Sequence, residues 1–223
     1  MNKTVLVVAA HPDDEVLGCG GTIARHVAEG DAVHVVFLSD GEGARQGAAP
    51  DATARREDDA ATALRILGAA APIFLGLEDN RLDAYALLDI VRPLEKVVAA
   101  LTPDVVYTHH CGDLNIDHRL AHCAVMTACR PLPGSPAKEI YSFEVVSSTE
   151  WGSPGVRDFT PQMYVDVSAY IALKQQALEA YREEMRAAPH ARSVENLAAL
   201  AAYRGASVGV AAAEAFMVMR VRR

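Results

Sequence analysis

The sequence lacks the features that mark several large classes of protein. Its formal net charge of −8 argues against a nucleic-acid-binding protein and against attachment to an anionic membrane surface. No apolar run approaches the roughly 20 residues of a membrane span, and we expect no secretory signal at the start. The four cysteines form no CxxC pair, so we expect free thiols in a cytoplasmic protein rather than a disulfide framework.

A nucleotide-binding glycine loop is also missing. Gly18, Gly20 and Gly21 do not follow the GxGxxG spacing, and they fall inside a predicted helix rather than at a strand-to-helix turn. We therefore interpret them as positions where a helix packs closely on a sheet.

Short apolar runs alternate with segments of helical periodicity along the whole chain. Strands are predicted at 5–10, 32–38, 72–75, 104–108, 139–146, 163–167 and 215–221. Helices are predicted at about 16–29, 53–67, 84–101, 117–129, 168–186 and 194–203, with Ser168 as the N-cap of the fifth. This alternation predicts an α/β fold, in which a doubly wound, mostly parallel sheet carries helices on both faces in a single domain over residues 1–223.

Polar residues follow the first predicted strand directly. The apolar run 5–10 ends at His11-Pro12-Asp13-Asp14-Glu15, at the edge of the sheet where ligands bind in open α/β proteins. His11 and Asp14 lie three residues apart across a turn that contains Pro12, so their side chains can converge, whereas Asp13 must project differently. Imidazole and carboxylate ligands without thiolate suit a catalytic zinc ion with an open position for water. Asp13 would then take the proton of this water and later pass it to the leaving amine.

A second polar cluster supplies candidates for a third ligand. It follows the strand 104–108 and contains His109, His110, Asp113, Asn115, Asp117 and His118. We select His118 as the third ligand, while His109, His110 and His122 remain alternatives on spacing alone. Asp117 either orients a ligating histidine or caps the next helix, and the sequence does not separate these two roles.

The two clusters together resemble the PIG-L/LmbE-like family of zinc-dependent N-deacetylases. The resemblance rests on residues 11–15 after a strand and on 113–119, and it extends to Arg56, Asp59, Asp79 and the segment 213–216, so that it covers essentially the whole chain. It implies a Rossmann-like fold and hydrolysis of an N-acetyl group, typically on a glucosamine unit of a small amino-sugar substrate. It also implies that His11, Asp14 and His118 bind zinc and that Asp13 is the general base.

One position departs from the family pattern. Many members carry a histidine three residues before the third ligand, where it can stabilise the oxyanion, and this chain has Asn115 there. The amide of Asn115 can donate a hydrogen bond but carries no charge. We therefore hypothesise that His110 supplies the missing electrostatic stabilisation.

Further residues are candidates for substrate binding. The resemblance places Arg56 and Asp79 near the sugar, although Arg56 with Asp59 also fits a solvated helical ion pair and Asp79 also fits a turn. His190 and Arg192 belong to a polar patch, residues 189–193, that either covers the site or forms an exposed linker. Trp151 lies in a loop rich in serine, glycine and proline, as a sugar-stacking platform or as a loop anchor.

Three other functions compete with N-deacetylation. A metal-dependent phosphoesterase with two metal ions would need about twice as many ligands, with Asp113 and Asp117 among them. A metal-dependent amidase acting on another small substrate would use the same site. A non-catalytic metal-binding or scaffold protein would have a closed site with no use for a spare carboxylate, which Asp13 argues against. A homo-oligomer is compatible with all of these readings.

Overall fold

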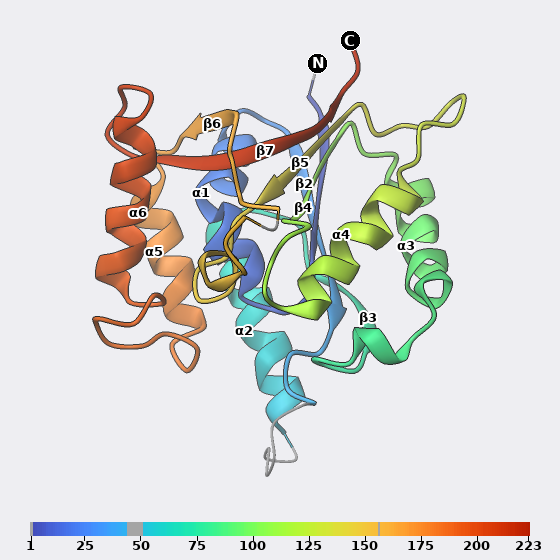
Figure 1. Ribbon diagram of the computed structural model, residues 1–223, viewed down its shortest axis with the longest axis horizontal. Helices are drawn as coiled ribbons and strands as arrows, with labels where there is room; N and C mark the ends of the chain where they lie inside the picture. Colours follow the sequence, from blue (N-terminus) through green and yellow to red (C-terminus); the bar gives the residue numbers. More distant parts are fainter. Residues whose placement is uncertain (1, 44–50, 156) are drawn as a thin grey trace.

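A seven-stranded sheet lies at the centre of the computed structural model, which describes residues 2–43, 51–155 and 157–223 (Figure 1). The strands lie in the order β3-β2-β1-β4-β5-β7-β6. The first five of these pair in parallel, and β7 pairs antiparallel with both β5 and β6. The sheet is therefore mostly parallel, as predicted. Its strands are β1 Thr4–Ala9, β2 Ala32–Ser39, β3 Ile73–Leu77, β4 Val105–His109, β5 Glu139–Phe143, β6 Met163–Asp166 and β7 Ala213–Val221.

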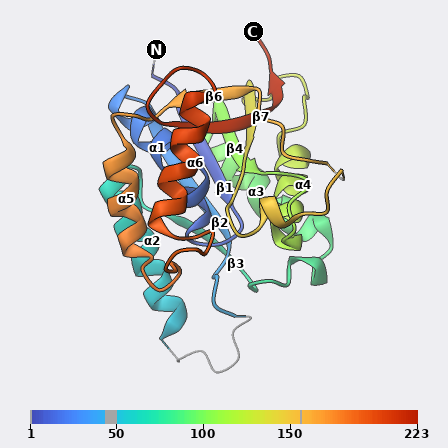
Figure 2. The ribbon, with the colours of Figure 1, turned by 60° about the vertical axis from the view of Figure 1, so that its left-hand side comes forward.

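Helices cover both faces of the sheet, which confirms the predicted three-layer α/β fold. Helices α1, α2 and α5 lie on one face and α3 and α4 on the other (Figures 1 and 2). Helix α6 packs beside β7. The bounds are α1 Asp14–Ala28, α2 Ala52–Leu67, α3 Leu87–Leu101, α4 Ile116–Ala128, α5 Ile171–Ala180 and α6 Val194–Ala206, with short 3-10 helices η1 at Leu82–Ala84 and η2 at Thr149–Trp151.

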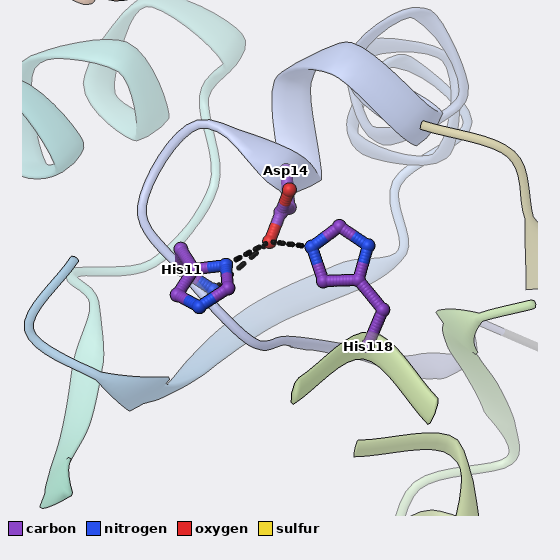
Figure 3. Close-up of side chains that lie close together, drawn as sticks. All are labelled: His11, Asp14 and His118. Atoms are coloured by element: carbon purple, nitrogen blue, oxygen red, sulfur yellow. Dashed lines mark hydrogen bonds and ion pairs between the residues drawn. The ribbon is translucent and has the colours of Figure 1, made fainter. Parts of the chain in front are cut away.

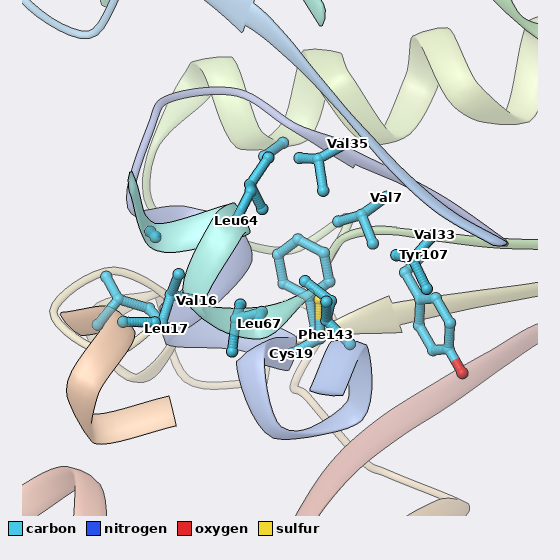
Figure 4. Packing of buried hydrophobic residues seen from close by; sticks show 14 of the residues in the cluster. Val7, Val16, Leu17, Cys19, Val33, Val35, Leu64, Leu67, Tyr107 and Phe143 are labelled. Carbon is cyan, nitrogen blue, oxygen red and sulfur yellow. The ribbon is translucent and has the colours of Figure 1, made fainter. Parts of the chain in front are cut away.

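Strand β1 is buried on both sides. Its side chains alternate, so that Val5 and Val7 join the apolar cluster under α1, α2 and α5, while Leu6 and Val8 join the cluster under α3 and α4. Figure 4 shows the first cluster, in which Val7 of β1 lies near side chains of α1, α2 and β5. Burial of this kind stabilises the fold by about 1.5–3 kcal/mol for each large apolar side chain.

Helix α1 is interrupted where it packs on the face of the sheet. Cys19 has non-helical backbone angles, φ −148° and ψ 25°. A Cβ atom on Gly18 would lie 2.3 Å from the Phe143 ring, and one on Gly21 would lie 2.8 Å from Val167. These contacts support the interpretation of close helix–sheet packing for Gly18 and Gly21, whereas a Cβ on Gly20 would meet Lys174 of α5 at 3.3 Å.

Three local predictions were wrong. The helix predicted at 168–186 ends at Ala180, and the other two concern Ser168 and the end of a strand. Ser168 does not cap a helix, because its hydroxyl donates to Asp166 Oδ1 at 2.6 Å and accepts from the backbone of Ala212, and α5 begins only at Ile171. The strand predicted at 139–146 ends at Phe143, since the chain then turns and Val145 N donates to Thr149 Oγ1 at 2.8 Å. Between the predicted strand 32–38 and the predicted helix 53–67, residues 44–50 lie outside the described residues. Among those that are described, no helix is long and apolar enough to cross a membrane.

Candidate active site

The strand order places the two polar clusters side by side. The chain runs from β1 outward through β2 to β3 and returns to β4 on the other side of β1. The carboxyl ends of β1 and β4 therefore flank the point where the strand order reverses, which is the usual ligand site of such sheets. His11 and Asp14 follow β1, and His118 lies in the first turn of α4, after β4.

Three predicted ligands converge on one point. Oδ2 of Asp14 lies 3.2 Å from Nδ1 of His11 and 3.3 Å from Nε2 of His118. Figure 3 shows the carboxylate of Asp14 between the two rings. Ligands about 2.0–2.1 Å from a tetrahedral zinc ion lie about 3.3 Å from one another. The spacing of these three side chains therefore fits a zinc ion or a similar divalent metal.

Each of the two imidazoles has a carboxylate at its other nitrogen. Nε2 of His11 lies 3.2 Å from Oδ2 of Asp117, and Nδ1 of His118 lies 3.2 Å from Oδ1 of Asp113. Metal-binding histidines are typically oriented in this way, which fixes the tautomer and the ring plane. Asp117 is not the helix cap, because the side chain of Asn115 accepts from Asp117 N at 2.8 Å.

The charges of the cluster also fit a metal ion. Burial alone would lower the pKa of His118, but the Asp14 and Asp113 carboxylates raise this pKa to about 9. Burial opposes ionisation of Asp14, yet the neighbouring histidines hold its pKa well below the usual range. Oδ1 of Asp14 is buried without a hydrogen-bond partner among the described residues. A bound cation would replace the protons on the imidazoles and satisfy this carboxylate.

The other histidines have different partners. Ala10 N donates to Nε2 of His109 at 2.8 Å, so this nitrogen is already an acceptor. Burial and the nearby His118 hold the pKa of His109 well below its usual value. Nδ1 of His122 bonds to the carbonyl of His109 at 2.9 Å. Of the alternatives left open by the sequence, neither of these two rings belongs to a group with metal-ligand spacing among the described residues.

Asp13 has an unusual backbone conformation. Its φ is 122°, which non-glycine residues rarely adopt. Glu15 stabilises this conformation, because its Oε2 accepts from Asp13 N at 3.0 Å while its Oε1 accepts from the hydroxyl of Tyr181 at 2.7 Å. Backbone strain of this type clusters at functional sites.

Arg192 pairs with Asp13. Nη1 of Arg192 donates to Oδ2 of Asp13 at 2.8 Å, and its Nε donates to the hydroxyl of Ser147 at 2.7 Å. Burial raises the pKa of Asp13 to about 6, and the guanidinium of Arg192 opposes this rise. The patch 189–193 is therefore not an exposed linker at Arg192, since this side chain reaches the centre of the site.

A cavity of about 430 Å³ opens beside the cluster. Arg56 and Asp79, predicted to bind substrate, both line it and are only 4 % and 3 % exposed. The alternative for Arg56, a solvated pair with Asp59, is not formed, because its guanidinium bonds to Glu42 and Glu184 instead. The other residues that line the cavity include His11, Asp13, His118, Asn115, Trp151, Glu184 and Arg192.

Four predicted residues do not line this cavity. Two of them, Asp14 and Asp117, are buried and contact His11, which does line it, and the other two are His110 and His190. His110 is buried, with Nε2 on the carbonyl of Arg157 at 2.6 Å, and its ring packs against Phe159. Its position therefore gives no support to the hypothesis that it stabilises an oxyanion. His190 does not line the cavity either, but its ring contacts Trp151 edge-on, with centroids 6.0 Å apart.

Some residues of the site were missed from the sequence. Asp113 was recognised as part of a motif but not as the partner of His118, and Ser147 and Glu184 carried no signal beyond being polar. The Asp113 contact was open to prediction, because an acidic residue five positions before a ligating histidine can fold back onto its ring. Ser147 and Glu184 are distant in sequence from the residues that they contact.

Comparison with known proteins agrees with this geometry. A family model described as PIG-L: GlcNAc-PI de-N-acetylase matches residues 6–129, a segment that contains all three predicted ligands and Asp13. The chain belongs to this family. The PIG-L assignment confirms the resemblance that residues 11–15 and 113–119 indicated.

Three similar proteins have different names. An uncharacterized deacetylase, YaiS, from Escherichia coli is 32 % identical over 186 residues, covering 81 % of this chain and 91 % of its own. A 4-oxalmesaconate hydratase from Pseudomonas putida is 30 % identical over 190 residues, covering 79 % and 72 %. The crystal structure of the conserved protein TT1542 from Thermus thermophilus has a TM-score of 0.77 and 32 % identity, covering 96 % and 94 %.

Proposed function

We propose that this PIG-L family protein is a zinc-dependent N-deacetylase that acts on an N-acetylglucosamine-type amino sugar or its conjugate. The observation that carries the proposal is the convergence of His11, Asp14 and His118 at 3.2–3.3 Å, with Asp13 beside them in an open cavity. The name of the matching family, a de-N-acetylase of a GlcNAc conjugate, supports the reaction and the class of substrate.

His11, Asp14 and His118 would hold the metal ion. A zinc ion bound there would lower the pKa of a water molecule and polarise the amide carbonyl of the substrate. The contacts of His11 with Asp117 and of His118 with Asp113 would keep both rings oriented toward the ion.

Asp13 would move the proton. Its carboxylate would accept a proton from the attacking water and deliver it to the amine nitrogen when the carbon–nitrogen bond breaks, so that acetate and a free amine leave. Arg192 holds Oδ2 of Asp13, which leaves Oδ1 for this transfer.

Asn115 would donate to the developing oxyanion. Its Oδ1 is held by Asp117 N, so the orientation of the amide is set, and its Nδ2 donates to Asn80 Oδ1 at 3.2 Å beside the cavity. Arg56 and Asp79 would contact the hydroxyl groups of the sugar. These roles remain proposals that mutagenesis can separate.

The test is release of acetate. Purified protein is incubated with N-acetylglucosamine and with glycosides of it, and acetate and free amine are measured with and without a zinc chelator. We expect equal amounts of both products, loss of turnover with chelator and recovery on adding zinc. Absence of acetate from all of these substrates, or turnover that the chelator leaves unchanged, would contradict the proposal.

Hydration is a second candidate because one relative is a hydratase. The same metal, water and Asp13 can serve the addition of water to a carbon–carbon double bond. An anionic substrate would need free guanidinium groups, however, and Arg56 and Arg192 are paired with Glu184 and Asp13 respectively. Loss of the ultraviolet absorbance of an unsaturated dicarboxylic acid, without acetate release, would favour hydration.

The two-metal phosphoesterase has less support. A second cluster with metal-ligand spacing contains His11, Asp79 and Asp117, and it shares His11 with the first. Two independent ligand sets therefore do not form around the cavity in the described part of the chain.

A further inference from the structure

An apolar rim borders the mouth of the cavity. It consists of Trp151, Leu114 and Ile116, which are 53 %, 51 % and 37 % exposed and which all line the cavity. The floor is the opposite in character, because Asp13, Asp79 and His118 are nearly buried. A polar floor under an exposed apolar rim is suited to a ligand with a polar reacting end and an apolar surface farther out.

Trp151 is not a buried loop anchor. More than half of its side chain is exposed, and its ring contact is with His190, edge-on at 82°. The rings of tryptophan present a wide, rigid apolar surface at small entropic cost, and an exposed tryptophan beside a cavity is a typical stacking platform.

The turn that carries Trp151 is fixed to the metal-site residues. Helix η2 begins at Thr149, whose hydroxyl donates to Oδ2 of Asp113 at 2.6 Å, and the hydroxyl of Ser148 donates to Oδ1 of the same carboxylate. Asp113 is also the partner of His118, 3.2 Å from its Nδ1. One buried carboxylate therefore sets the position of the platform relative to the predicted zinc ligand, and such fixed supports give a binding site its precision.

We infer that Trp151, with Leu114 and Ile116, is the surface of this chain that binds the ring attached to the N-acetylated sugar, and that Trp151 sets the preference of the site between a conjugate and the free monosaccharide. The acetamido sugar occupies the polar floor, and the second ring places its apolar face on the indole. This face is either the C–H face of a second pyranose or an aromatic aglycone. The inference rests on the proposed deacetylation and assigns a specificity-determining residue to it.

The kinetic test uses three substrates: N-acetylglucosamine, N,N′-diacetylchitobiose and 4-nitrophenyl N-acetylglucosaminide. For Trp151→Ala we expect the ratio of kcat/KM for a conjugate to kcat/KM for N-acetylglucosamine to fall by about tenfold. Trp151→Phe should restore most of this ratio. The control is Leu132→Ala, which removes an equally exposed apolar side chain (52 %) that does not line the cavity and should change neither the ratio nor the activity.

The two conjugates distinguish the sources of the ring. If only the kcat/KM ratio for N,N′-diacetylchitobiose falls, the partner of Trp151 is a sugar. If only the ratio for 4-nitrophenyl N-acetylglucosaminide falls, the partner is an aromatic aglycone. An unchanged ratio for both conjugates, or equal losses on all three substrates, would overturn the inference while leaving deacetylation intact.

A binding measurement separates this inference from the proposed reaction. Trp151 is the single tryptophan of the chain, so the intrinsic tryptophan fluorescence reports on this ring alone. Titration of the zinc-loaded protein with N,N′-diacetylchitobiose, in the Asp13→Asn variant to prevent turnover, should shift the emission, and N-acetylglucosamine should shift it much less. If the wild-type protein releases no acetate, the proposed function fails, and the emission still decides whether Trp151 binds the second ring. Equal responses to both sugars would contradict that role.

Discussion

Two buried clusters of charged side chains contact helix α1, and they differ in whether their carboxylate oxygens have hydrogen-bond partners. Near the kink of the helix, Glu214 accepts from Gly21 N, Thr22 N and the Thr22 hydroxyl, and from Nζ of Lys174 at 2.6 Å. At the start of the same helix, Asp14 meets His11 and His118 on one oxygen and leaves its other oxygen without a partner among the described residues.

This difference separates a structural cluster from a binding site. The carboxylate of Glu214 replaces helix hydrogen bonds that the kink at Cys19 interrupts, so its bonding capacity is used within the fold. The side chains around Asp14 converge on a point beside a cavity, which His11 and His118 both line. Substitutions in the first cluster should therefore reduce stability, and substitutions in the second should reduce function.

The largest expected effect is on turnover in the Asp13→Asn variant. The amide cannot accept the proton, so kcat should fall by about 10²–10⁴-fold while zinc remains bound. Acetate release and metal content are measured on the same preparation. Asp58→Asn, which removes an exposed carboxylate of α2, is the control and should retain full activity. An active Asp13→Asn enzyme would refute the assignment of the base.

The next effect is on stability in the Glu214→Ala variant. This change leaves the ammonium of Lys174 and the amides of Gly21 and Thr22 buried without their partner, and it should lower the free energy of unfolding by about 3–5 kcal/mol. Urea denaturation measures it. Glu78→Ala breaks the exposed pair with Arg81 and should cost less than about 1 kcal/mol. Loss of zinc from folded Glu214→Ala protein would contradict the separation of the two clusters.

The cluster around Asp14 was easier to predict from the sequence than the cluster around Glu214. The segment around His11–Glu15 can be interpreted from its own sequence, because the residues that follow a buried strand lie at the edge of the sheet. The match with the second polar cluster then required only the parallel order of β1 and β4. Glu214 could not be assigned in the same way, since its role depends on a kink in a helix that lies far away in the sequence.

The same reason explains which contacts of the site the sequence did not predict. Arg192 was predicted to bind substrate, and its pairing with Asp13 joins residues from opposite ends of the chain. His110 was proposed for the oxyanion because it precedes Asn115 closely, but the turn after β4 directs its ring toward Arg157. Short spacings were informative where a strand or helix fixed the side-chain direction, and less informative within a turn.

An intermediate effect is expected for Tyr181→Phe, which acts on the support of Asp13. The variant removes the hydroxyl that donates to Oε1 of buried Glu15, and it should lower the free energy of unfolding by about 1–3 kcal/mol. A fall in kcat should accompany it, because Glu15 holds the strained backbone of Asp13. Tyr203→Phe, on a side chain that is 65 % exposed, should change neither quantity. A stable Tyr181→Phe protein with unaltered kcat would contradict the role of this support.

The smallest effect is expected for Ser147→Ala. The variant removes one acceptor of Arg192 while the bond from Arg192 to Asp13 remains, so kcat/KM should fall by less than about tenfold. Steady-state kinetics of acetate release measure this change. A loss as large as that of Asp13→Asn would show that the hydroxyl of Ser147 has a more direct part in the reaction.

The zinc content of three preparations tests the central claim most directly. Wild-type protein and Asp13→Asn should each bind about one zinc ion per chain, because Asp13 lies outside the ligand set, whereas His118→Ala should bind almost none. Metal analysis of the purified, folded proteins gives the answer without any knowledge of the substrate. Stoichiometric zinc in His118→Ala, or loss of zinc in Asp13→Asn, would contradict the assignment of His11, Asp14 and His118 as the metal site.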